Sequence, residues 1–104
     1  MRAKLSLGGS NPFSGLTVVN MSPALAEELD FDPFVTGVVV RALSRNSLSA
    51  RYRFRPGDII LSVMDTEITS TTQFQDVLDE FDENRNWDLT FERGGRVHKS
   101  RIRF

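Results

Sequence analysis

The chain has 104 residues, enough for one domain built around one hydrophobic core. It is 39% hydrophobic and 26% charged, as expected of a globular domain, and its net charge of −1 argues against a general nucleic-acid binder. The absence of cysteine excludes disulfides and thiolate metal sites. No apolar run approaches the roughly 18–20 residues of a membrane span, and no signal peptide is expected in the first ten residues.

The first half of the chain predicts two strands and a helix. Met1–Ser10 is interpreted as a tail or linker, because it has no sustained apolar pattern and ends in glycine and serine. Leu16–Val19 is a β-rich run and predicts a strand. Ser22 is a good helix cap in front of a first-turn proline, so a helix is expected over Pro23–Leu29. A further strand is expected over Gly37–Leu43.

The second half predicts a strand, a longer helix and a hairpin. A helical turn is expected over Ser44–Tyr52, before a central strand at Ile59–Val63. A helix begins at Thr71, because Ser70 can cap it and apolar residues then recur at helical spacing. The last strands are predicted within Trp87–Phe104, where apolar and polar residues alternate around a two-glycine turn.

This order of elements predicts an α+β fold. Strands outnumber helices and the connections are short, so we expect a small, mostly antiparallel sheet or partial β-barrel flanked by two helices. Residues 1–10 are assigned to the tail or linker, and residues 11–104 to one domain.

The sequence contains no recognisable catalytic or metal-binding motif. His98 is the only histidine, and no serine nucleophile motif or second ligand accompanies it. No phosphate-binding loop or calcium loop is present. We therefore predict no catalytic residue, no metal and no cofactor, so that binding becomes the expected function.

Charge is unevenly spread along the chain. One acidic stretch consists of Asp76, Asp79, Glu80, Asp82 and Glu83. A basic group lies at the C-terminus: Arg93, Arg96, Lys99, Arg101 and Arg103. Solvated faces are the simplest interpretation, and a contact surface for another subunit is the alternative. Nucleic-acid binding by the basic group is not expected, because the isoelectric point is about 5.8.

A short loop before the first predicted strand suggests a binding role. In the segment FSGL, Phe13–Leu16, Gly15 allows successive backbone amides to point into one concavity, which would form an anion-binding nest. The strand that follows could offer an open edge to which a peptide adds. A plain turn glycine beside core residues is the competing interpretation.

Three segments together resemble a PDZ domain: FSGLTVV, TGVVVRALSRNSLSARYRFRPGDIILSVMDTEI and TSTTQFQDVLDEF. More narrowly, the segment NPFSGLTVVNMSPALAEELDFD resembles the C-terminal PDZ domains of bacterial HtrA (Do-like) periplasmic serine proteases. The resemblance covers nearly all of residues 11–104, and RPGDIILSV is its most specific motif.

The resemblance implies a peptide-binding site between a strand and a helix. The loop would bind a C-terminal carboxylate through backbone amides, and the helix that begins at Thr71 would form the opposite wall. The implied site residues are Phe13, Ser14, Gly15, Leu16, Thr17, Val18, Thr71, Gln75 and Leu78. Phe74 is the alternative to Leu78 if the helix is rotated.

The sequence departs from the family pattern at three places. Ser14 stands where an apolar residue is usual, Met64-Asp65 replaces a common Asn-Gly turn, and Arg53 replaces a glycine. A non-glycine residue at such a turn predicts a strained or reshaped backbone.

The expected function is capture of protein C-termini or extended hydrophobic segments by β-augmentation, within an HtrA-like serine endopeptidase whose catalytic residues lie outside this chain. Expected partners are unfolded polypeptides, the protease domain and other PDZ domains, in the periplasm and without nucleic acid or a membrane span. Two alternatives remain: an assembly element that contacts neighbouring subunits without binding free peptide, and a stand-alone adaptor.

Overall fold

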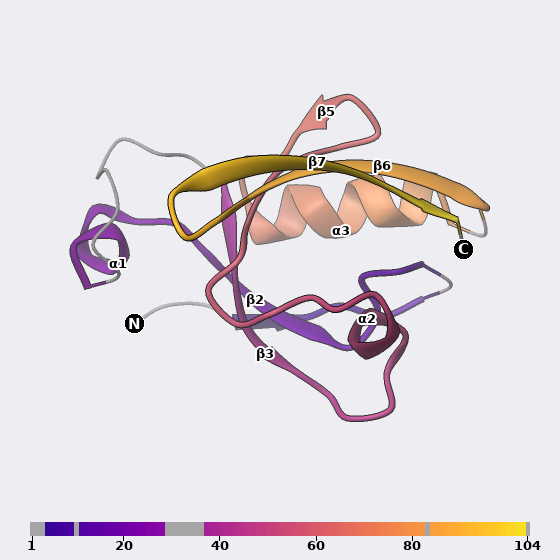
Figure 1. The fold of residues 1–104 in the computed structure, drawn as a ribbon, viewed down its shortest axis with the longest axis horizontal. Coiled ribbons are helices and arrows are strands. Elements are labelled where there is room, and N and C mark those ends of the chain that lie inside the picture. The colour runs from indigo at the N-terminus through magenta and orange to yellow at the C-terminus, as the bar shows by residue number, and fades with distance from the viewer. Residues whose placement is uncertain (1–3, 10, 29–36, 83, 104) are drawn as a thin grey trace.

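The described residues, 4–9, 11–28, 37–82 and 84–103 of this computed structural model, form an open antiparallel sheet with three short helices (Figure 1). The α+β prediction is confirmed, and the sheet does not close into a barrel. The elements are β1 (Lys4–Ser6), β2 (Leu16–Asn20), α1 (Pro23–Glu28), β3 (Val38–Leu43), α2 (Leu48–Arg51), β4 (Ile59–Val63), β5 (Thr66–Glu67), α3 (Thr71–Glu80), β6 (Asn86–Arg93) and β7 (Arg96–Arg103). The third helix, α2, is the helical turn predicted from the sequence.

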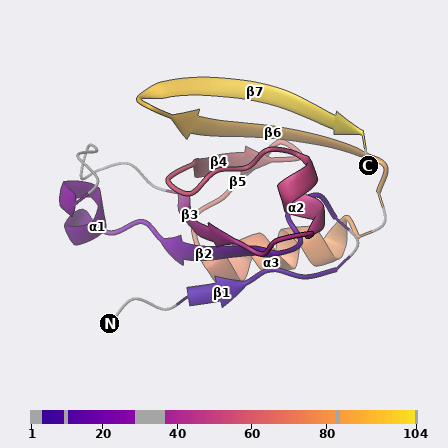
Figure 2. The same ribbon diagram turned by 60° about the horizontal axis from the view of Figure 1, so that its bottom comes forward.

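The strands follow the order β1-β2-β3-β4-β6-β7, and β5 pairs with β4 outside this path. Every pair is antiparallel. Figure 2 shows the β6–β7 hairpin on one side of the molecule and β1 on the other. Strand β2 therefore has a neighbour on each of its two edges.

Local signals in the sequence position the helices. Ser22 Oγ accepts a hydrogen bond from Leu25 N at 3.1 Å, which caps α1. Ser70 Oγ accepts from Gln73 N at 3.1 Å, and Gln73 Oε1 accepts in return from Thr69 N at 3.0 Å. The predicted capping box at the start of α3 is thus present, except that the Gln73 side chain accepts from the amide of Thr69 instead of that of Ser70.

Most of the buried apolar residues form one large cluster. It runs from Leu7 and Phe13 through β2, β3 and β4 to α3, Trp87 and Leu89. A smaller cluster joins Val19, Leu25, Val39 and Ile59 beneath α1. The predicted α1 residue Leu29 and the final Phe104 lie outside the described residues.

At two of the three departures from the family pattern, Arg53 and Met64-Asp65, the backbone has the positive φ expected where glycine is usual. Arg53 has φ +63°, and Met64 and Asp65 have φ +52° and +62°. All three residues adopt the left-handed conformation that favours glycine, so each turn stores strain.

The turn Arg55–Asp58 is held by an ion pair between the buried carboxylate of Asp58 and the half-buried side chain of Arg93. Asp58 is 1% exposed and accepts hydrogen bonds from Arg93 Nε at 2.8 Å and Arg93 Nη2 at 2.7 Å. Its Oδ2 also accepts from Arg55 N at 3.0 Å. The hydrogen bond to Asp58 raises the pKa of Arg93, and burial opposes this shift. The turn is thereby fastened to β6.

The N-terminal residues differ from the prediction. Lys4–Ser6 form β1 on the edge of β2, and Leu7 is buried in the large cluster. The interpretation of residues 1–10 as a tail or linker is therefore wrong for residues 4–7, because this segment pairs with β2 and Leu5 and Leu7 bury apolar surface. The expectation that β2 offers an open edge is also wrong, since β1 occupies that edge.

Candidate functional site

The loop before β2 is organised by Asn11, which is 1% exposed. Its Oδ1 accepts from Phe13 N at 2.9 Å, and its backbone carbonyl accepts from Ser14 N at 3.2 Å. Leu16 N donates to Phe13 O at 3.1 Å. The Asn11-Pro12 pair therefore starts a side-chain-stabilised turn that brings the chain into β2.

Gly15 is required at its position by its backbone and by its neighbours. Its φ is +98°, and a Cβ added there would lie 2.2 Å from Ser47 Cβ. The loop is also bonded to the segment around α2, because Ser49 N donates to Ser14 O at 3.0 Å and Ser44 N to Gly15 O at 2.9 Å. Only glycine fits where the loop comes this close to the Ser47 side chain.

Helix α3 lies opposite β2 and forms the other side of the candidate site. Asn20 Oδ1, at the end of β2, accepts from Thr71 N at 2.6 Å and so fixes the start of the helix relative to the strand. On α3, Phe74 and Leu78 are fully buried in the cluster that also contains Leu16 and Val18. The strand and helix thus flank an apolar site, here called the groove, which β1 fills.

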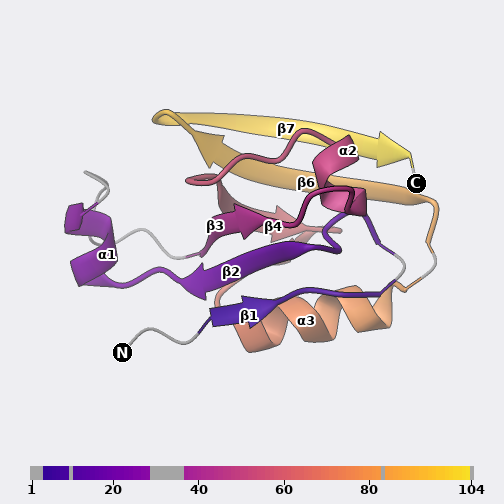
Figure 3. The same cartoon turned by 90° about the horizontal axis from the view of Figure 1, so that it is seen from below.

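Strand β1 lies in this groove. It contacts both β2 and α3, and Figure 3 shows it between them. Its register places Leu5 opposite Val18 and Ser6 opposite Thr17. Leu7 N extends the ladder by donating to Leu16 O at 2.8 Å.

The leucines of this segment point into the groove. Leu7 is 4% exposed and belongs to the large cluster, and the half-buried Leu5 packs against the same cluster. Ser6, between them, is exposed. This alternation is that of an extended chain with one face buried.

The loop amides already have partners within the chain. Gly15 N donates to Leu7 O at 3.0 Å, while Ser14 N and Leu16 N make the turn bonds described above. The main-chain carbonyl of Leu7 therefore stands where an incoming acceptor would meet the Gly15 amide.

The structure brings most of the predicted site residues together. Leu16, Val18 and Leu78 share the large apolar cluster, Thr71 is buried at the start of α3, and half-buried Thr17 lies on β2 opposite Ser6. Half-buried Gln75 bonds through Nε2 to Asp79 Oδ1 at 2.9 Å.

Phe13 has a different place from that expected of a ligand contact. Its ring centroid lies 5.2 Å from those of Phe54 and Phe74 and 5.9 Å from that of Trp87. It anchors the loop in the aromatic part of the core, where such ring pairs are favourable.

Sequence reasoning missed four residues that shape the groove: Leu5, Leu7, Asn11 and Asn20. The alternation of Leu5 and Leu7 with polar neighbours was a usable strand signal, although a short one. The Asn20 contact joins residues 51 positions apart, and no local pattern announces it.

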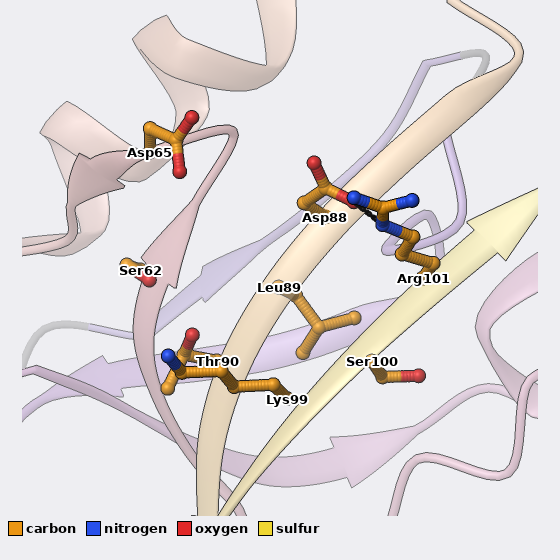
Figure 4. A pocket seen from close by; sticks show the side chains of 8 residues that line it. All are labelled: Ser62, Asp65, Asp88, Leu89, Thr90, Lys99, Ser100 and Arg101. Carbon is orange, nitrogen blue, oxygen red and sulfur yellow. Dashed lines mark ion pairs between the residues drawn. The ribbon is translucent and has the colours of Figure 1, made fainter.

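A separate hollow lies on β4, β6 and β7 (Figure 4). It is lined by Ser62, Asp65, Asp88, Leu89, Thr90, Lys99, Ser100 and Arg101, none of which is a predicted site residue. Arg101 Nε lies 3.2 Å from Asp88 Oδ1 across its rim, in an exposed ion pair. Among the described residues no group of three metal-binding side chains occurs, and no described helix has the length and apolarity to cross a membrane.

Comparison with known proteins identifies the family. The PDZ domain family model matches residues 12–103, and the chain belongs to that family. No curated protein matches the chain. The crystal structure of the HtrA3 PDZ domain bound to a phage-derived ligand (FGRWV) is 19% identical, with a TM-score of 0.69 over 99% of this chain and 86% of that one.

A second similar structure is that of the HtrA-type protease AlgW with a decapeptide. It is 21% identical, with a TM-score of 0.68 over 98% of this chain. The present chain spans 29% of the AlgW chain. The PDZ fold predicted from the sequence is therefore confirmed, with HtrA-type PDZ domains among its structural neighbours.

Proposed function

We propose that this PDZ domain binds extended peptide segments by β-augmentation in the groove between β2 and α3. One observation carries the proposal: the groove already holds an extended segment, β1, antiparallel to β2 and with alternate leucines turned inward. A ligand strand with apolar side chains at alternate positions would make the same bonds.

The loop supports a role for a free C-terminus. Gly15 N donates to the carbonyl of the chain in the groove, and the Ser47 side chain leaves no room for a side chain at position 15. A terminal carboxylate would take the place of the Leu7 carbonyl and would gain from its charge. Hydrogen bonds to charged groups contribute roughly 1.5–3 kcal/mol each.

We further propose that the domain serves an HtrA/Do-like serine endopeptidase of the periplasm. It would capture C-termini or unfolded segments and present them to a protease domain elsewhere in the protein, alongside other PDZ domains. The similarity to PDZ domains that were solved with peptides, including one from an HtrA-type protease, supports this role. The domain itself is non-catalytic.

A second candidate is an assembly element that binds no free peptide. The occupied groove favours it, because a segment of the same chain already uses the strand edge and the Gly15 amide. The two candidates differ in whether an added peptide binds to β2.

Titration followed by amide chemical shifts distinguishes them. A five-residue peptide with an apolar C-terminal residue should shift the amides of β2 and α3 and leave those of β7 unchanged. Its C-terminally amidated form should bind about tenfold or more weakly. Absence of binding at millimolar peptide, or shifts confined to the β6–β7 hairpin, would favour the assembly element.

A further inference from the structure

We propose that residues 4–9, here named the N-terminal arm, act as an internal competitor for the peptide groove. The inference rests on the proposed peptide-binding function and goes beyond it, because it assigns a regulating segment to the same groove.

The polarity of the arm is that of a bound peptide. The arm runs antiparallel to β2, so its C-terminal end meets the loop at Gly15. Leu7 there fills the position of a last ligand residue: its side chain is buried in the core cluster and its carbonyl accepts from Gly15 N. Leu5, two residues earlier, is the second inward side chain.

The arm has the features of a segment that can leave its site. Strand β1 has only three residues and forms the end of the sheet. Gly8 and Gly9 follow Leu7, and Gly9 has φ +101°. Asn11 Nδ2 donates to Gly8 O at 2.9 Å, so the C-terminal end of the arm is anchored to the loop, and the loop has turn bonds of its own.

Occupation of the groove by the arm lowers the apparent affinity for any added ligand. The apparent affinity equals the intrinsic affinity multiplied by the fraction of molecules whose groove is free, so an arm that is seated nine-tenths of the time weakens binding about tenfold. A short flexible connection gives the arm an effective concentration on the order of millimolar. Only a ligand that resembles the arm, or one at high local concentration, would displace it.

A reversible crosslink tests the arm in the full chain. Ser6 and Thr17 are opposite each other in the register, outside the large apolar cluster, and the natural chain has no cysteine. The variant Ser6→Cys/Thr17→Cys can therefore lock β1 onto β2 when oxidised and release it when reduced. The probe is a fluorescent peptide with the sequence of residues 3–7, Ala-Lys-Leu-Ser-Leu, with a free C-terminus.

The reduced form should bind this probe at least tenfold more tightly than the oxidised form, and added reductant should restore binding. The two single-cysteine variants are matched controls and should respond to neither treatment. A probe with both leucines replaced by serine should lose about tenfold or more in affinity, because each leucine buries apolar surface.

A second variant needs no crosslink. Leu5→Ser weakens the seated arm at a half-buried position without emptying the centre of the core. It should bind the probe severalfold more tightly than the natural chain. Equal affinity of Leu5→Ser and the natural chain, with both folded, overturns the competitor.

The outcomes separate this inference from the proposed function. Equal probe affinity in the oxidised and reduced forms overturns the competitor and leaves peptide binding intact. Equal affinity for the leucine and serine probes shows that the probe does not bind where Leu5 and Leu7 lie, and this result also overturns the competitor. If the natural chain, the reduced variant and Leu5→Ser all fail to bind the probe and the apolar five-residue peptide, the proposed function and the inference fall together, and β1 is a structural strand.

Discussion

Replacing Gly15 with alanine should destabilise the fold well beyond an ordinary glycine substitution. The residue combines φ +98° with a position where a new Cβ would lie 2.2 Å from Ser47 Cβ and 2.5 Å from Ser47 Oγ. Gly57 is a matched control, because its φ is +96° and a Cβ there would meet nothing within 4 Å. The two substitutions thus share the backbone strain and differ in the collision.

The expected losses in the free energy of unfolding follow from the backbone angles and the contacts. Left-handed strain costs an L-residue roughly 1–2 kcal/mol, partly offset by the lower entropy of the unfolded chain. Gly57→Ala should therefore lower the free energy of unfolding by about 1 kcal/mol. Overpacking adds roughly 1–3 kcal/mol, so Gly15→Ala should cost about 2–4 kcal/mol.

Urea denaturation of both variants gives these free energies by linear extrapolation. A third measurement places Gly15→Ala in a Ser47→Gly background, where the colliding side chain is absent and the α2 cap loses only a few tenths of a kcal/mol. The cost of Gly15→Ala should fall there toward that of Gly57→Ala. Equal costs for the two glycine substitutions in the natural background would refute the close-approach argument.

Four further substitutions test other parts of the fold in the same denaturation assay. Arg93→Met should cost about 3 kcal/mol, because it leaves the Asp58 carboxylate buried without its ion pair, whereas Arg101→Met, at an exposed pair, should cost less than about 1 kcal/mol. Asp65→Gly should stabilise the left-handed turn by about 0.5–1 kcal/mol, and a loss of stability would show that the aspartate side chain contributes there. Leu78→Ala should cost about 2–5 kcal/mol because the side chain is fully buried, and a cost below 1 kcal/mol would place it outside the core.

The elements that could be predicted from sequence are those with local causes. Ser22 and Ser70 cap the helices that follow them, and each bond forms within three residues. Gly94 and Gly95 both have positive φ, as a two-residue hairpin turn requires. Such features depend on neighbours in the chain, so a sequence pattern is enough to find them.

The parts that escaped prediction depend on distant partners. Three residues of β1 have little strand preference alone, and their order comes from pairing with β2 and from leucine burial against α3. The two-residue β5 follows a turn that lacks the usual Asn-Gly signal. The resemblance placed Phe13 among the residues of the binding loop, and the sequence did not show its ring partners, Phe54, Phe74 and Trp87, because they lie 41 or more positions away.

The far end of the sheet has a consequence for self-association. Strand β7 ends the strand order of the described residues, and it carries Arg96, Lys99, Arg101 and Arg103. Two copies that met edge to edge through β7 would bring these cations together, which protects an otherwise available strand edge. The repulsion acts over about 8 Å at physiological ionic strength and only about 3 Å at 1 M salt, so concentrated salt should promote pairing of the domain through this edge.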